Sequence, residues 1–199
     1  MRLVAVGVSL GGLDAVRRLL RALPAQVRDP IVLVQHRRHD VGAGPLVSLL
    51  AECTKRVVVE PEDKTPLQEW HVFVAPAGYH LLVGLKELSL SMEPPVRYAR
   101  PSIDVLFESA AVSFGEDLTA VVLTGASDDG AAGAAMVRKC GGRVFVQTPA
   151  LSESAVAPLA TKARLLPDLE GDIEVLAQGL LREVESPRVR RGRRMARDL

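Results

Sequence analysis

Three polar groups occur where apolar strands are predicted to end: Ser9, His36 and one aspartate of the pair Asp128-Asp129. A serine hydroxyl becomes a nucleophile when a base takes its proton. An imidazole can be that base, and a carboxylate on its other ring nitrogen orients it. Sites in open α/β sheets form beyond the carboxyl ends of the strands. The sequence therefore predicts that a nucleophile, a general base and an orienting acid meet at this edge.

Each of these residues also has a purely structural interpretation. Ser9 could be a turn residue or a helix cap, His36 a solvated residue at a strand end, and one of the two aspartates a cap of the alanine-rich helix that follows. We favour the catalytic interpretation because three separate strand ends carry the required groups. The chain order serine, histidine, aspartate differs from that of the α/β-hydrolases, so their nucleophile elbow is not a match.

The turn from Gly7 to Gly12 offers a rival interpretation, a nucleotide- or phosphate-binding loop. A dinucleotide-binding turn reads G-x-G-x-x-G, but Ser9 stands at the middle glycine position. No acidic residue closes the predicted strand 31–34, so the usual partner of a ribose hydroxyl is missing. Both observations favour a nucleophile loop over a cofactor loop.

Apolar runs alternate with helical periodicity along most of the chain. We predict strands at 3–6, 31–34, 57–59, 118–124 and 143–147, and helices at 13–23, 45–53, 103–113, from the end of the glycine-rich turn 125–133 to about 139, 154–163 and 172–184. Short strands at 71–75, 79–83 and 88–91 predict an antiparallel hairpin added to the main sheet. The predicted fold is thus α/β: a doubly wound, mostly parallel sheet with helices on both faces and an added antiparallel hairpin.

One helix start carries a clear signal. Ser102 follows a loop rich in proline and arginine and is a predicted N-cap, with Asp104 in the first turn and Gly115 just past the end of the helix.

Bulk properties narrow the class of protein. The chain has 199 residues, 48% of them hydrophobic, and a formal net charge of +1, which predicts one domain over 1–186 and argues against a nucleic-acid partner. We find no signal peptide and no membrane-spanning run. Cys53 and Cys140 offer neither a disulfide framework nor metal-ligand spacing. We expect a cytoplasmic monomer with reduced thiols and neither metal nor cofactor.

The end of the chain, 187–199, holds six arginines. One interpretation is a solvated, disordered tail. The other is an electrostatic anchor for an acidic partner or an anionic lipid surface.

Several motifs occur together in one known family. They are Gly7-x-Ser9-x-Gly11-Gly12, Gln35-His36, Val74-Ala75-Pro76 with His80, Arg100-Pro101-Ser102-Ile103-Asp104-Val105-Leu106-Phe107, and Leu123-Thr124-Gly125 through Asp129-Gly130-Ala131-Ala132-Gly133. From about residue 3 to 170 the sequence resembles the catalytic domain of the chemotaxis-receptor protein-glutamate methylesterases, the CheB type.

The resemblance implies a serine hydrolase that cleaves methyl esters of glutamate side chains on chemoreceptors and releases methanol, with deamidation of receptor glutamines as a second activity. Ser9 would be the nucleophile and His36 the general base. The family aspartate directly precedes a glycine, which selects Asp129 over Asp128. The oxyanion candidates are the backbone N–H groups of Ala126 and Leu10. The candidates for the substrate loop are Gly11, Gly12, Arg37 and Arg100.

The implied partners are the cytoplasmic domain of a methyl-accepting chemoreceptor and other proteins of a chemosensory array. Members of the family commonly carry a receiver domain that masks the site. We expect no such switch in this chain, and therefore constitutive activity or control by another protein. The rival interpretations are an adaptor with a decayed site and a hydrolase acting on another ester or amide.

Overall fold

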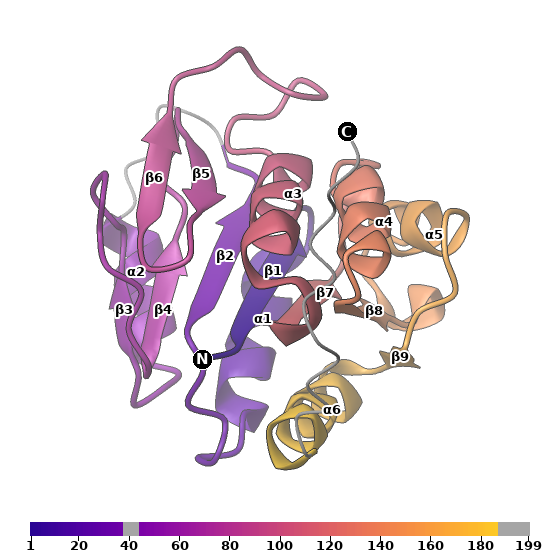
Figure 1. Cartoon of the computed structure of the whole chain (residues 1–199). Helices are drawn as coiled ribbons and strands as arrows, with labels where there is room; N and C mark the ends of the chain where they lie inside the picture. The colour runs from indigo at the N-terminus through magenta and orange to yellow at the C-terminus, as the bar shows by residue number, and fades with distance from the viewer. Residues whose placement is uncertain (38–43, 187–199) are drawn as a thin grey trace.

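A central sheet of seven parallel strands organises the computed structural model, which describes residues 1–37 and 44–186 (Figure 1). Its strands are β1 (Leu3–Val8), β2 (Ile31–Gln35), β3 (Val57–Val59), β4 (His71–Val74), β7 (Leu118–Val122), β8 (Arg143–Gln147) and β9 (Leu169–Gly171). β1 and β7 are buried along their whole length. Continuous apolar runs of this kind are typical of strands covered by helices on both faces.

The strand order brings the predicted site residues to neighbouring strands. It reads β3-β4-β2-β1-β7-β8-β9, and every pairing is parallel. From β1 the chain first builds outward through β2 and later returns to add β7 on the other side. The carboxyl end of β1 is therefore a topological switch point, where ligands bind in open α/β sheets.

Two sets of helices cover the two faces of the sheet, as predicted. The helices are α1 (Gly12–Ala22), α2 (Gly44–Ala51), α3 (Ile103–Phe114), α4 (Ala131–Lys139), α5 (Val156–Lys162) and α6 (Ile173–Glu185), with 3₁₀ turns at Gly115–Asp117 and Pro149–Leu151. One apolar core holds side chains of α3, α4 and α5, and the other holds those of α1, α2 and α6. In Figure 1, α3 and α4 lie in front of the sheet.

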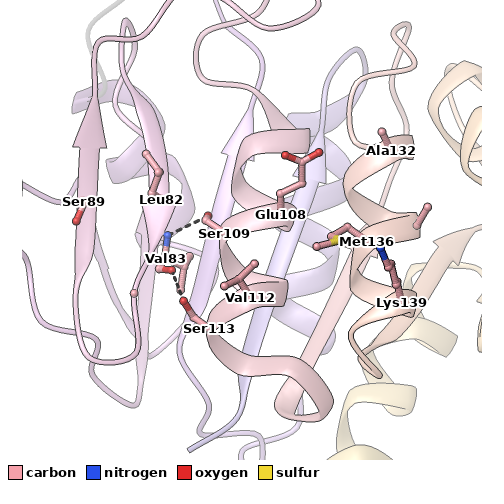
Figure 2. A pocket seen from close by; sticks show the side chains of 12 residues that line it. Leu82, Val83, Ser89, Glu108, Ser109, Val112, Ser113, Ala132, Met136 and Lys139 are labelled. Carbon is pink, nitrogen blue, oxygen red and sulfur yellow. Dashed lines mark hydrogen bonds between the residues drawn. The ribbon is translucent and has the colours of Figure 1, made fainter. Parts of the chain in front are cut away.

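The predicted antiparallel hairpin is present, but the grouping of strand 71–75 with it was wrong. Strands β5 (His80–Val83) and β6 (Leu88–Ser91) do pair antiparallel, but they form a sheet of their own. β4, which we grouped with them, lies inside the main sheet between β3 and β2. The hairpin packs on α3, where the Ser109 hydroxyl accepts the N–H of Val83 at 3.1 Å and the Ser113 hydroxyl donates to its carbonyl at 2.7 Å (Figure 2).

One strand was not predicted, and one prediction stays untested. The short edge strand β9 was not predicted, because its three residues carry no apolar alternation. The arginine-rich tail, 187–199, lies outside the described residues.

Candidate active site

Ser9 lies at the turn between β1 and α1. Its N–H donates to the carbonyl of Thr124 at 3.0 Å, and its carbonyl accepts the N–H of Gly12 at 2.9 Å. Gly11 is the N-cap of α1 and has φ 75°. Glycine adopts this left-handed conformation at no steric cost, so the chain can pass directly from strand to helix. The serine is thereby held at the carboxyl edge of the sheet.

His36 directly follows β2, next to Ser9. Its N–H donates to the carbonyl of Val8 at 3.0 Å, which continues the ladder between β1 and β2 by one residue. Since Val8 is in register with Gln35, Ser9 and His36 occupy equivalent positions on neighbouring strands. Both line one open cleft of about 560 Å³. Its remaining lining residues are Leu10, Gly11, Gly12, Leu13, Asp14, Arg17, Gln35 and Glu153.

Asp129 reaches His36 from the loop after β7. The Nε2 of His36 donates to Oδ2 of Asp129 at 2.7 Å, and the Asp129 side chain has no exposed surface. This contact assigns the proton to Nε2 and leaves Nδ1 as the acceptor nitrogen of a neutral ring. The structure thus places a histidine and an aspartate from separate strand ends in contact at this edge, and their catalytic roles with Ser9 stay a prediction.

Four donors hold the Asp129 carboxylate. Besides His36, it accepts the N–H groups of Ile103 at 2.8 Å and Asp104 at 3.0 Å, and the hydroxyl of Ser102 at 2.8 Å. Burial alone would raise the pKa of Asp129, but these hydrogen bonds outweigh it and hold the pKa below its ordinary value. The carboxylate is thus kept ionised, which is the state that can stabilise a protonated imidazole.

A second buried carboxylate, Asp104, supports the same loop. Its Oδ1 accepts the N–H groups of Gly130 at 2.9 Å and Gly133 at 2.7 Å, at the start of α4. Burial raises its pKa, the charge of Asp129 adds to this rise, and the hydrogen bonds that it accepts oppose it. We expected Asp128 or Asp129 to cap α4, but the N-cap residue is Gly130 and the capping carboxylate comes from α3.

The oxyanion candidates lie beside Ser9. A methyl group on Gly125 would be 3.0 Å from the Cβ of Ser9, so the strand end that leads to Ala126 packs directly against the serine. Within the described residues, the N–H groups of Leu10 and Ala126 have no hydrogen-bond partner. Both residues are exposed. The Thr124 hydroxyl donates to the carbonyl of Leu10 at 2.9 Å and accepts the N–H of Ser154 at 2.9 Å, which fixes the turn.

The structure does not bring the two predicted arginines to the cleft. Arg37 donates to Glu60 at 2.5 Å and to the carbonyl of Ala75 at 2.9 Å. Arg100 donates to the carbonyls of Met92 and Glu93 at 2.9 and 3.1 Å. Both guanidinium groups make hydrogen bonds within the protein itself. The sequence alone suggested exposed side chains, because charged residues in predicted loops usually face solvent. Gly11 and Gly12, in contrast, do line the cleft.

Sequence reasoning missed two supporting residues. Ser102 was predicted only as the N-cap of α3, a role it fills by accepting the N–H of Val105 at 3.4 Å. His80 is buried; its Nδ1 accepts the N–H of Ser102 at 3.2 Å, and its Nε2 donates to the carbonyl of Pro94 at 3.1 Å. The family motifs that contain Ser102 and His80 were the available signal for these roles.

A larger hollow lies elsewhere. It measures about 880 Å³, is lined by residues of the β5–β6 hairpin, α3 and α4, and includes none of Ser9, His36 and Asp129 (Figure 2).

Within 1–37 and 44–186, no helix is long and apolar enough to cross a membrane.

The fold and the site define a class of protein: an α/β enzyme with a histidine–aspartate pair beside a serine at the switch point of the sheet. Comparison with known proteins agrees. The family model described as CheB methylesterase matches residues 4–178. The chain belongs to this CheB methylesterase family, which makes it an enzyme of the protein-glutamate methylesterase class.

Individual relatives support the assignment. A protein of Leptospira interrogans with the provisional name protein-glutamate methylesterase/protein-glutamine glutaminase is 37% identical over 183 residues, 90% of this chain and 93% of that one. The protein-glutamate methylesterase FrzG of Myxococcus xanthus is 40% identical over 151 residues, 75% of this chain and 45% of its own length. The crystal structure of the Thermotoga maritima CheB methylesterase catalytic domain matches with a TM-score of 0.87 at 25% identity, over 92% of this chain and 98% of that one.

Proposed function

We propose that this protein is a serine hydrolase that removes methyl esters from glutamate side chains in the cytoplasmic domains of chemoreceptors and releases methanol. The observation that carries the proposal is the 2.7 Å bond between His36 and the buried Asp129, with His36 in the same cleft as Ser9. The family membership supports the choice of ester.

In the proposed reaction, the Ser9 hydroxyl oxygen attacks the ester carbonyl carbon while Nδ1 of His36 accepts its proton. Asp129 holds Nε2 and stabilises the imidazolium that forms. The C–O bond to the methoxy group then breaks, and the proton on Nδ1 passes to that oxygen, so methanol leaves. Water attacks the acyl-enzyme in the reverse sense and frees the glutamate carboxylate and the Ser9 hydroxyl.

The tetrahedral intermediate carries a negative oxygen that needs donors. We assign the N–H groups of Leu10 and Ala126 to it, because both are unpartnered within the described residues and flank the serine. A backbone donor does not depend on the side chain, so alanine at position 126 is compatible with the role. The turn that Thr124 fixes would keep the Leu10 donor in place.

A second activity follows from the same chemistry. A glutamine carboxamide attacked by Ser9 would lose ammonia in place of methanol and yield the same acyl-enzyme. The names of several relatives include protein-glutamine glutaminase, which supports testing this reaction.

Methanol release from a methylated receptor cytoplasmic fragment tests the function. The wild type should release methanol. Ser9→Ala should lower kcat by roughly 10⁶. Ser48→Ala, on the exposed side of α2, is the matched control and should behave as wild type. Release by Ser9→Ala at the wild-type rate would overturn the mechanism. No release by the wild type, with the fragment still bound, would favour the decayed adaptor instead.

A further inference from the structure

The loop before α3 contains an unusual turn. Val96 and Ala99 exchange both backbone hydrogen bonds, at 3.1 and 2.8 Å, and the two residues between them, Arg97 and Tyr98, have φ values of 47° and 62°. Two central residues with positive φ define a type I′ turn, which strongly prefers Asn-Gly. Arginine and tyrosine carry Cβ atoms that disfavour this conformation, so something outside the turn must maintain it.

The side chain of Arg97 supplies a reason. Its Nε donates to Oδ2 of Asp104 at 3.1 Å, and its Nη1 donates to Oδ2 of Asp128 at 2.5 Å. One planar guanidinium therefore joins two carboxylates from different elements, a geometry that suits arginine and that a lysine ammonium cannot reproduce. Tyr98 contributes nothing comparable, because its side chain is fully exposed.

The two carboxylates that Arg97 joins lie on either side of Asp129. Asp128 precedes it in the chain. Asp104 donates its N–H to Oδ1 of Asp129 and accepts the N–H of Gly130, the next residue. Because the Asp104 side chain is only 5% exposed, its pairing with Arg97 is not an ordinary surface ion pair. Arg97 thus braces the backbone on both sides of the aspartate that holds His36.

We propose that Arg97 is a positioning residue for catalysis: its guanidinium, held by the turn 96–99, bridges Asp104 and Asp128 and so fixes the Asp129–His36 pair. Arg97 does not reach the cleft, and it acts through these two carboxylates. Without it, Asp104 loses its only cationic partner among the described residues, and Asp128 loses its ionic link to Asp104, so the loop is held to the start of α3 by hydrogen bonds alone.

The test separates the stability of the turn from the role of the side chain. The double substitution Arg97→Asn with Tyr98→Gly gives the turn its preferred sequence, which offsets part of the stability lost with the ion pair, so the protein should still fold. Its kcat on the methylated receptor fragment should nevertheless fall by roughly 10- to 100-fold with little change in KM, because a small displacement of the His36 pair impairs proton transfer. Tyr98→Gly alone is the control and should keep the wild-type kcat. Arg97→Lys should recover only part of the loss.

This inference rests on the proposed function, because its kinetic test uses the proposed substrate. A second measurement therefore uses no substrate. The Nε2–H proton of His36, bonded to Asp129, should give a downfield NMR signal in the wild type that broadens or disappears in the double variant and persists in Tyr98→Gly. Wild-type kcat and an unchanged His36 signal in the double variant would overturn the role of Arg97. Failure of the wild type itself to release methanol would refute the proposed substrate and leave the NMR comparison valid.

Discussion

Asp104 and Asp129 exchange helix caps. Asp129, which lies just before α4, accepts two N–H groups from the first turn of α3, while Asp104, in that same turn, accepts two N–H groups from the start of α4. Each carboxylate satisfies donors that a helix start leaves unpaired, and each faces the positive end of the other helix. The aspartate that orients His36 is thus also a structural cap.

This double role shapes the expected effect of Asp129→Asn. The amide keeps the size of the side chain but carries no charge, and it can offer its NH₂ group to the imidazole and so favour the wrong tautomer. We expect kcat to fall by roughly 10⁴, as in other triads. Methanol release under saturating substrate measures this loss. A fall of less than tenfold in a variant that keeps the native circular dichroism spectrum would argue against the assigned role of Asp129.

Ser102→Ala tests the support of Asp129 separately from its charge. The substitution removes a donor to Asp129 and the N-cap of α3, at a cost of about 1 kcal/mol in the free energy of unfolding. Asp172→Ala is the matched control, because Asp172 caps α6 by accepting the N–H of Val175 at 2.8 Å. Urea unfolding should show similar destabilisation in both variants, whereas only Ser102→Ala should lower kcat. Equal kcat values in the two variants would mean that Ser102 acts only as the N-cap of α3.

The pH dependence of stability should distinguish the two aspartates. An unfolded aspartate has a pKa of about 3.9. The pKa of folded Asp129 lies below this value, so its contribution to stability is complete above about pH 3.9 and is lost as the pH falls through the folded pKa. The pKa of folded Asp104 is raised, so Asp104 lowers the free energy of unfolding as the pH rises above about 3.9, and it has no such effect at lower pH.

We therefore expect the free energy of unfolding of the wild type to fall more steeply below about pH 3.9 than that of Asp129→Asn. Urea titrations at several pH values between about 2.5 and 7 measure the difference. Parallel curves below pH 3.9 would mean that Asp129 is not held ionised in the folded state.

Much of the fold could be predicted because its signals are local. Buried parallel strands are continuous apolar runs, and α1 shows one apolar face, with Val16, Leu19 and Leu20 in the core. The placement of β4 could not be read in this way, because a four-residue apolar strand has the same pattern in a parallel sheet as in a hairpin. Its partners β2 and β3 are chosen by the tertiary packing.

The same distinction between local signals and tertiary packing applies to the candidate site. Ser9, His36 and one aspartate of the pair Asp128-Asp129 could be placed at this edge because each follows a recognisable strand, and the family resemblance then selected Asp129. The exchange of caps could not be predicted, because Asp104 lies more than 25 positions from Gly130 and Gly133, whose N–H groups it accepts. Nor could the internal hydrogen bonds of Arg37 and Arg100, because a guanidinium bound within the protein and a solvated one have the same sequence signature. Long-range pairing of polar groups is specified only by the folded backbone.

The bond between Asp129 and Nε2 of His36 has one further consequence. In the proposed reaction it leaves Nδ1 as the base, and Nδ1 is attached to Cγ and lies closer to the main chain than Nε2, so the proposed nucleophile must come from a segment that runs directly beside the histidine backbone. The ladder between β1 and β2 meets this demand. An alkylating affinity reagent bound in the cleft would accordingly label the ring at Nδ1. Peptide mapping of the two isomeric adducts would show which ring nitrogen faces the cleft.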